Sequence, residues 1–323
     1  MTAPLLQLRA LTKHFGGGSL WRGDALVRAV ESVDLDVFPG EVVGLVGESG
    51  SGKTTVARCS LRLVEPTSGT IHFAGTELGP LTTSQLRPLR RRMQYIFQDP
   101  FGSLSPRMNV EQILTEGLAI QSIGTPSQRR DRAAEMLSLV ELPTDALSRY
   151  PHEFSGGQRQ RLGIARALAL APDLLVADEP VSALDVSIQA QIVNLLRSLQ
   201  SRMNLAMLFI SHDLAVVEYL CDRVVVLYLG RIMESAPTNR LYTTPQHPYT
   251  RALLQAIPVP DPGAPPRRAL LQGDIPSPAN PPTGCVLHTR CPFVLPQCTT
   301  SAPPLREVAT GHLAACWRDD LDA

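Results

Sequence analysis

A glycine-rich stretch supplies the first residues whose types and spacing could do chemistry. Residues 47–54 read GESGSGKT and fit the pattern G-x-x-x-x-G-K-[S/T]. In this pattern backbone N–H groups face phosphate oxygens, and the helix that follows adds the positive end of its dipole. Lys53 would reach the β- and γ-phosphates of a nucleotide, and Thr54 would hold Mg²⁺. A chance match in an ordinary loop is the alternative. It is disfavoured because EVVGLV before the stretch is typical of a strand and TTVARCSLRL after it of a helix.

A pair of carboxylates follows a second apolar run. Asp178 comes directly after Leu174–Ala177, and Glu179 is the next residue. Because parallel α/β sheets bind ligands at the carboxyl ends of their strands, Asp178 is placed to hold Mg²⁺ through water. Glu179 could polarise an attacking water as a general base. Alone, such a pattern is often a buried strand with a polar exit, but together with the phosphate loop it predicts a nucleotide hydrolase.

A third stretch, FSGGQRQR at residues 154–161, indicates how many chains share the nucleotide. Its Ser-Gly-Gly turn opens a helix-like segment and therefore offers a second anion-binding end. One ATP does not need two such ends from one chain, whereas two chains facing head to tail do. A plain capped helix start would explain the Ser-Gly-Gly turn if it stood alone.

In combination these motifs resemble the ATP-binding subunits of ABC transporters. The resemblance implies that GESGSGKT is the Walker A loop, LLVADE the Walker B motif and FSGGQ the signature. It implies that Gln98 contacts Mg²⁺ and senses the membrane subunit, and that His212 contacts the γ-phosphate. Asp185 would lie in the D-loop at the dimer seam. Phe15 would stack on adenine, with Trp21 as the alternative.

The resemblance thus implies ATP and Mg²⁺ as ligands and names a set of residues for each. The catalytic residues are Glu179, His212 and Gln98. The nucleotide-binding residues are Phe15, Gly47, Ser49, Gly50, Ser51, Gly52, Lys53, Thr54, Thr55, Gln98, Asp178, Ser155, Gly156, Gly157, Gln158 and Asp185. The Mg²⁺ ligands are Thr54, Gln98 and Asp178.

Two further stretches point to one branch of this family. PFGSLSPRM at 100–108 and HPYTRALL at 247–254 resemble the oligopeptide/dipeptide importer ATPases, and the first is more like the "F" than the "D" partner of an ATPase pair. The resemblance implies two transmembrane permease subunits, a second, paralogous ATP-binding subunit and an extracytoplasmic substrate-binding protein. It implies a peripheral location on the cytoplasmic face of the inner membrane.

Other substrates and other ABC ATPases are the alternatives at this point. Nickel chelates or glutathione could replace peptides as cargo. A DNA- or ribosome-linked ATPase is disfavoured because the chain shows no long coiled coil and no basic excess, with Lys+Arg and Asp+Glu at 30 each. We therefore expect no nucleic-acid partner. No apolar run reaches the roughly 18 residues of a membrane span, and the N-terminus does not read as a signal peptide.

The C-terminal part of the sequence carries four of the six cysteines: Cys285, Cys291, Cys298 and Cys316. Their spacings are C-x5-C, C-x6-C and C-x17-C, without the close pairs usual at structural zinc sites. Disulfides are disfavoured in a reducing compartment. Four thiolates suit an iron–sulfur cluster, and resembling family members carry a [4Fe–4S] centre. The sequence therefore predicts such a cluster, with zinc or a tail without metal as the alternatives.

The pattern of elements predicts an α/β protein. Strands are expected over 32–37, 41–46, 173–178 and 205–210, and helices over 132–140 and 187–199. The resemblance implies a P-loop ABC ATPase with a RecA-like parallel sheet, an antiparallel β subdomain and an inserted helical subdomain at about 99–165. Because 13 of the 28 prolines lie in 258–304, we place a domain boundary between an ATP-binding domain at 1–257 and a small cysteine-containing domain at 258–323.

Overall fold

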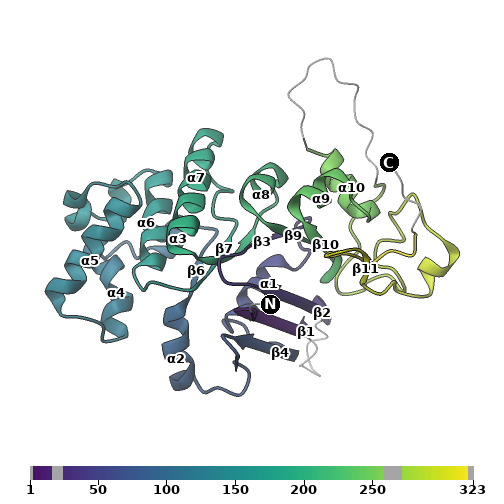
Figure 1. Ribbon diagram of the computed structural model, residues 1–323, viewed down its shortest axis with the longest axis horizontal. Helices are drawn as coiled ribbons and strands as arrows, with labels where there is room; N and C mark the ends of the chain where they lie inside the picture. The colour runs from purple at the N-terminus through teal and green to yellow at the C-terminus, as the bar shows by residue number, and fades with distance from the viewer. Residues whose placement is uncertain (1–2, 17–24, 258–270, 319–323) are drawn as a thin grey trace, which may run out of the picture. The chain divides into compact units, whose positions relative to one another are not determined.

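The computed structural model describes residues 3–16, 25–257 and 271–318. The chain divides into two compact units, each assembled from separate stretches of sequence (Figure 1). The first unit comprises Met1–Leu6, Val37–Glu41 and His72–Ile210. The second comprises Gln7–Asp36, Val42–Ile71 and Ser211–Ala323. Within the described ranges, no helix combines the length and the apolar character that crossing a bilayer requires.

Three parallel strands form the centre of the first unit. They are β6 (Met93–Ile96), β7 (Leu174–Asp178) and β8 (Ala206–Ile210), and β7 pairs with both of the others. Every residue of β7 and β8 is buried, as expected of parallel strands that are covered on both faces. The predicted strands over 173–178 and 205–210 are therefore confirmed to within a residue.

The rest of the first unit is mostly helical. Its α-helices are α2 (Thr83–Arg92), α3 (Pro100–Ser103), α4 (Val110–Ile120), α5 (Pro126–Leu139), α6 (Gly156–Leu168) and α7 (Val186–Met203). Two 3₁₀ turns, η1 (Thr144–Ser148) and η2 (Pro151–Glu153), precede α6. Helices α4, α5 and α6 pack against one another (Figure 1). The helices predicted over 132–140 and 187–199 are thus confirmed by α5 and α7, and the helical subdomain at about 99–165 stays a prediction.

Capping residues explain where four of these helices begin. The side chains of Thr82, Asn109, Thr125 and Ser155 each accept a hydrogen bond from the backbone N–H three residues on, and each of those residues is a glutamine that returns a contact. Such reciprocal capping satisfies two of the N–H groups that a helix start leaves unpaired. The starts of α2, α4, α5 and α6 are therefore set by local sequence.

The second unit combines parallel and antiparallel pairing. Strands β1 (Leu6–Phe15), β2 (Val27–Val37) and β4 (Ser68–Phe73) are neighbours in the order β2-β1-β4. Strand β3 (Val42–Val46) runs parallel to β9 (Arg223–Tyr228), which pairs antiparallel with β10 (Arg231–Pro237). The short β5 (Thr76–Glu77) forms a hairpin with the end of β4 in the first unit. The predicted strands over 32–37 and 41–46 are confirmed, the first as part of the longer β2.

The helices of the second unit are short, and its C-terminal part extends a sheet. They are α1 (Lys53–Ser60), α8 (Leu214–Leu220), α9 (Thr238–Thr243) and α10 (Pro248–Gln255), followed by the 3₁₀ turn η3 (Pro296–Thr299). Strand β12 (His312–Ala314) pairs antiparallel with β10 and with β11 (Arg306–Ala309). We call residues 271–318 the tail; through β12 it is hydrogen-bonded to the sheet that contains β3 and β9.

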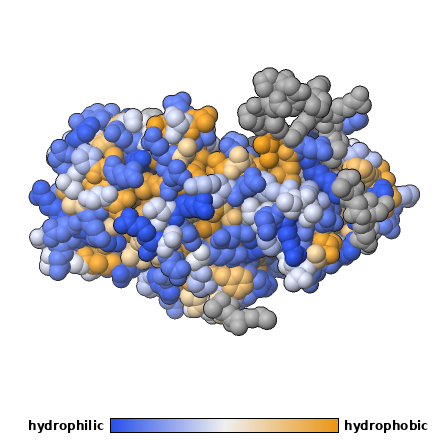
Figure 2. Space-filling view, turned by 45° about the horizontal axis from the view of Figure 1, so that its top comes forward, coloured by the Kyte–Doolittle hydropathy of each residue, from blue (hydrophilic) through white to orange (hydrophobic). Residues whose placement is uncertain are grey.

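On the face drawn in Figure 2, hydrophobic residues are interspersed with hydrophilic ones. Large apolar side chains that are exposed in the described residues include Val186 at 81%, Ile120 at 53% and Leu63 at 48%. Single exposed apolar side chains need no special explanation. Val186 is the most exposed of them, and it directly follows Asp185, one of the predicted dimer-seam residues.

Candidate active site

The phosphate loop joins the end of β3 to the start of α1 in the second unit. Gly47, Gly50 and Gly52 have positive φ angles of 151°, 77° and 104°. A Cβ on Gly47 would lie 2.1 Å from the carbonyl oxygen of Leu227, and one on Gly52 would lie 2.3 Å from that of Ala29. Only glycine fits such positions. These glycines therefore give the curled loop that was predicted for 47–54.

Lys53 lies under this loop and is 6% exposed. Its Nζ donates to the carbonyl oxygens of Gly47 at 2.8 Å and Glu48 at 2.9 Å, with the Ser51 hydroxyl at 3.4 Å. The first turn of α1 has neither a side-chain cap nor an acidic residue. Its positive dipole end is therefore not offset by local negative charge and suits a phosphate group. Thr54 and Thr55 follow in that turn, both half-buried.

The predicted carboxylates lie at the end of β7 in the first unit. Asp178 is 2% exposed, and one of its oxygens accepts a 2.6 Å hydrogen bond from the Tyr95 hydroxyl. The carboxylate of Glu179 accepts a 2.8 Å hydrogen bond from Nε2 of Gln98. The structure thus brings Gln98 and Glu179 together, as expected of two residues predicted to act on the same nucleotide.

Glu179 adopts an unusual backbone conformation. Its φ is +46°, in the left-handed region that a residue with a side chain rarely occupies. Its N–H donates to the carbonyl oxygen of Ile210 at 3.0 Å, and its carbonyl oxygen accepts from the Ser182 hydroxyl at 3.1 Å. Backbone held in sparsely populated conformations clusters at active sites. The turn therefore fixes where the Glu179 side chain leaves the strand.

The signature and D-loop residues lie against each other in the first unit. Ser155 caps α6, and Gly156 and Gly157 form its first turn. A Cβ on Gly157 would lie 2.5 Å from Cγ2 of Ile188, and one on Gly156 would lie 3.5 Å from Leu184. Glycine at 157 therefore permits close packing of α6 on the segment around Asp185, which begins α7 without a side-chain capping bond.

The remaining predicted nucleotide residues lie in the second unit. Phe15 is 42% exposed at the end of β1, with Nζ of Lys13 at 4.9 Å from its ring centroid. Its competitor Trp21 lies outside the described residues. His212 is exposed and precedes Asp213, whose Oδ1 caps α8 by accepting from the N–H groups of Ala215 and Val216.

Comparison with known proteins agrees with these motifs. Residues 30–182 match the family model of the ABC transporter, and residues 233–298 match that of the oligopeptide/dipeptide transporter C-terminal region. A putative peptide import ATP-binding protein of Brucella ovis is 63% identical over 318 residues, which cover 98% of this chain and 99% of that protein. The chain belongs to the ABC transporter family.

Two further relatives extend this family assignment. The oligopeptide transport ATP-binding protein AppF of Bacillus subtilis is 49% identical, over 97% of this chain and 96% of its own length. Among solved structures, the dimeric ATP-binding cassette MJ0796 bound to ADP and Pi has a TM-score of 0.65 and 29% identity. That alignment covers 72% of this chain and 98% of the cassette. The predicted P-loop ABC ATPase fold is therefore confirmed.

Sequence reasoning missed two residues of this ABC protein that contact its motifs. Tyr95 donates to Asp178, and its ring centroid lies 4.8 Å from that of Phe97. Arg290, in the tail, forms a two-pronged ion pair with Glu48 of the phosphate loop. The only sequence signal for Arg290 was its place directly before Cys291, which says nothing about a partner 242 residues away.

The four tail cysteines of this ABC protein are all free thiols. Burial raises the pKa of Cys285 to about 11, and Cys298, Cys291 and Cys316 act on it electrostatically in the same direction. Burial likewise raises the pKa of Cys291 and of Cys316, and Cys298 is among the groups acting on each. The backbone N–H of Cys285 donates to the carbonyl oxygen of Cys298 at 2.8 Å, so the backbones of these two cysteines lie side by side although they are not adjacent in sequence.

In the described part of the chain, no group of three or more His, Cys, Asp or Glu side chains is placed to hold a metal ion. The [4Fe–4S] cluster and its zinc alternative therefore stay predictions from the sequence.

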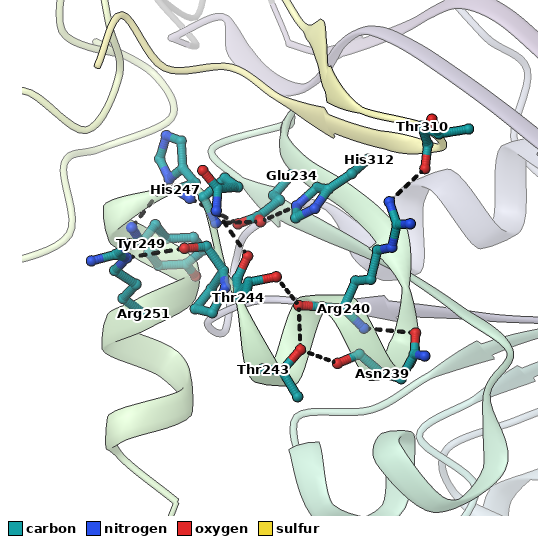
Figure 3. Close-up of polar contacts among 12 residues, drawn as sticks. Glu234, Asn239, Arg240, Thr243, Thr244, His247, Tyr249, Arg251, Thr310 and His312 are labelled. Carbon is teal, nitrogen blue, oxygen red and sulfur yellow. Dashed lines mark hydrogen bonds and ion pairs between the residues drawn. The ribbon is translucent and has the colours of Figure 1, made fainter. Parts of the chain in front are cut away.

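A buried polar group joins the tail to strand β10 (Figure 3). Glu234 is fully buried, and its Oε1 accepts a 2.6 Å hydrogen bond from Nε2 of His312 on β12. Its Oε2 accepts a 3.0 Å hydrogen bond from the N–H of His247, which caps α10. Nearby, Nη1 of Arg240 donates to the carbonyl oxygen of Thr310 at 2.9 Å. These contacts attach the tail to the rest of the second unit.

Proposed function

We propose that this chain is the ATP-hydrolysing subunit of a membrane ABC importer that takes up di- or oligopeptides. The contact between Gln98 and Glu179, directly after the buried Asp178, carries the hydrolytic part of the proposal. Those three residues would supply the carboxylates and the amide of the ATPase site, at the carboxyl end of β7. The peptide part is supported by relatives named as peptide import and oligopeptide transport ATP-binding proteins.

Each predicted residue takes a role that its surroundings support. The buried Lys53 can exchange its bonds to Gly47 and Glu48 for bonds to phosphate oxygens. The hydroxyl of Thr54, the amide oxygen of Gln98 and the carboxylate of Asp178 are oxygen donors of the kind that Mg²⁺ prefers. Bound Mg²⁺ would neutralise charge on the phosphates. Glu179 is the carboxylate available to orient and deprotonate water, and His212 would contact the γ-phosphate.

The signature motif supports a proposal of paired ATP-binding subunits. Ser155, Gly156, Gly157 and Gln158 form the start of α6 and would bind the ATP of a facing chain. Asp185 directly precedes Val186, whose side chain is 81% exposed and offers an apolar surface for that partner. The partner would be a second, paralogous ATP-binding subunit, and adenine would stack on Phe15 or Trp21.

We assign the remaining partners from the same proposal. Two transmembrane permease subunits would hold the ATPase pair at the cytoplasmic face of the inner membrane, and an extracytoplasmic binding protein would deliver the cargo. We also propose that residues 1–257 form the ATP-binding domain and residues 258–323 a small cysteine-containing domain. No nucleic acid is required for this cycle.

We further propose that Cys285, Cys291, Cys298 and Cys316 ligate a [4Fe–4S] cluster. The spacing of these cysteines, without the close pairs usual at structural zinc sites, favours it over zinc. The cluster would join parts of a tail that contains few large buried side chains. Iron and sulfide assays after anaerobic purification test this; stoichiometric zinc without sulfide would overturn it.

The proposed function is tested by reconstitution. The chain is purified with its permease and ATPase partners, placed in vesicles, and assayed for ATP-dependent uptake of labelled peptides, nickel chelates and glutathione. Peptide uptake that stops when Glu179 is replaced by glutamine is the expected result. Uptake of a different solute in preference to peptides would overturn the cargo assignment but leave the ATPase assignment standing.

A further inference from the structure

Glu48, the second residue of the phosphate loop, is held by two elements outside the loop. Its N–H donates to the hydroxyl of Tyr249 on α10 at 2.8 Å. Its carboxylate accepts from both terminal nitrogens of Arg290, at 2.8 and 3.1 Å. On the inner side of the loop, its carbonyl oxygen accepts from Nζ of Lys53 at 2.9 Å. One residue therefore connects the tail, α10 and the phosphate-binding lysine.

The guanidinium of Arg290 contacts both Glu48 and Tyr228. Its side chain is 9% exposed, and its carbon Cζ lies 5.8 Å from the ring centroid of Tyr228, whose hydroxyl is 3.4 Å from Nη1. A guanidinium stays protonated in proteins, so the ion pair with Glu48 does not depend on its titration. A lysine would not serve equally well, because only the planar fork can bind both carboxylate oxygens at once. The ring centroids of Tyr228 and Tyr249 lie 4.7 Å apart, so the two residues that contact Arg290 and Glu48 also pack against each other.

Arg290 is carried by a compact turn that also carries two of the cysteines. The N–H groups of Arg290 and Cys291 both donate to the carbonyl oxygen of Leu287, at 2.9 and 3.0 Å. The N–H of His288 donates to the carbonyl oxygen of Cys285 at 3.0 Å, and Leu287 is 1% exposed. The position of the guanidinium therefore depends on the fold of the tail, because this turn carries the backbone of Arg290.

We propose that Arg290 is a positioning residue for ATP binding, which holds Glu48 and so sets the phosphate loop in the shape that receives ATP. This rests on the proposed role of the loop in binding ATP phosphates. It makes nucleotide affinity depend on the tail, a segment that contributes no residue to the nucleotide motifs. Arg290 would touch neither ATP nor Mg²⁺ and would act only through Glu48.

The test is a titration of the purified full-length chain with a fluorescent ATP analogue and Mg²⁺. Arg290→Ala should raise the Kd roughly 5- to 50-fold, in the range usual for coupling between sites. Arg290→Lys should lie between this variant and the wild type. Glu48→Gln combined with Arg290→Ala should be no worse than Arg290→Ala alone, because both remove the same contact. In ATPase assays the KM for ATP should rise while kcat changes less than about threefold.

Arg240→Ala is the matched control. It also removes an arginine that bridges to the tail, through Thr310, but that contact is remote in sequence from the phosphate loop and involves none of its residues (Figure 3). Its Kd for ATP should stay within about twofold of the wild type. Iron content and melting temperature are recorded for each variant, so that a lost tail is distinguished from a lost contact.

Two outcomes would overturn the inference. One is an unchanged Kd in both Arg290→Ala and Arg290→Lys. The other is a double variant whose fold-increase in Kd equals the product of the fold-increases in the two single variants. If Arg290→Ala fails to fold, Arg290→Lys and Glu48→Gln decide the question by the same criteria. A wild-type chain that binds no ATP would instead refute the proposed function itself.

Discussion

The phosphate loop and the cysteine-containing tail lie in the same unit but are built in opposite ways. The loop is eight consecutive residues, 47–54, shaped by its own glycines and by the burial of Lys53. The tail spreads four cysteines over a stretch with few large buried side chains. It is attached through contacts made elsewhere in the unit, notably Glu234 with His312 and Glu48 with Arg290.

Each region is therefore vulnerable to a different kind of substitution. The phosphate loop takes most of its geometry from its own glycines, so the largest losses of ATP binding should come from its own residues, and the contact of Glu48 with Arg290 should add a smaller effect. A dispersed site takes its geometry from its neighbours, so substitutions far from its ligands should disturb it.

The largest effect is expected at Glu179. Glu179→Gln should lower kcat for ATP hydrolysis by about 10²–10⁴-fold, because the amide cannot accept a proton from water. ATP binding should persist, and ATP should be trapped in a stable dimer. Steady-state hydrolysis and nucleotide retention on a sizing column measure the two. Glu135→Gln, which changes an exposed carboxylate paired with Arg132, is the control; near-normal turnover in Glu179→Gln would refute the assignment.

A change within the phosphate loop should strongly weaken ATP binding and leave the tail intact. Lys53→Ala removes a charged donor to the phosphates, which is worth roughly 10- to 100-fold in affinity. Titration with a fluorescent ATP analogue measures the loss, and iron content should equal that of the wild type. If iron disappeared together with ATP binding, the two regions would not be independent in this direction.

A change within the tail should have the reverse pattern. Cys291→Ser should remove the metal and loosen the tail while leaving Lys53 able to bind ATP, with affinity reduced only as far as Arg290 is displaced. Iron and sulfide assays with an ATP titration measure both. Cys59→Ser, at a buried cysteine outside the tail, should retain iron. Full iron loading of the Cys291→Ser protein would count against the cluster.

The smallest effect concerns pH and the attachment of the tail. Burial lowers the pKa of His247 to about 4, so the folded protein keeps the ring neutral. The unfolded chain takes up a proton near pH 6.5. The stability that comes from the neutral ring is therefore fully present above about pH 6.5 and is lost as the pH falls towards and through 4.

His247→Asn should flatten this dependence, because asparagine can still cap α10 but does not titrate. In the same buried group, Glu234 accepts hydrogen bonds from the backbone N–H of His247 and from Nε2 of His312. Melting temperatures at pH 7.5 and pH 5 should differ by about 2–4 °C less in the variant. His152→Asn, at an exposed histidine, is the control; equal slopes in His247→Asn and the wild type would contradict the prediction.

Contiguous sequence patterns were enough to predict the features whose geometry depends on residues that are neighbours in the chain. The loop at 47–54, the strand ending in Asp178 and the helix starting after Ser155 were all predicted from contiguous patterns, and each lies in the expected element. The apolar runs predicted β3, β7 and β8, because a strand that is buried on both faces consists of a nearly continuous run of apolar residues.

The contacts between distant segments depend instead on how the elements pack. No local pattern could indicate that Tyr95 donates to Asp178, that Glu234 binds His312, or that Arg290 reaches Glu48. Each of these pairs joins side chains on different elements, and which side chains meet depends on how those elements pack. The sequence identified the four cysteines as a set, but whether they lie together depends on the same packing. The tail is rich in proline and poor in regular structure, so it has no periodicity from which their positions could be predicted.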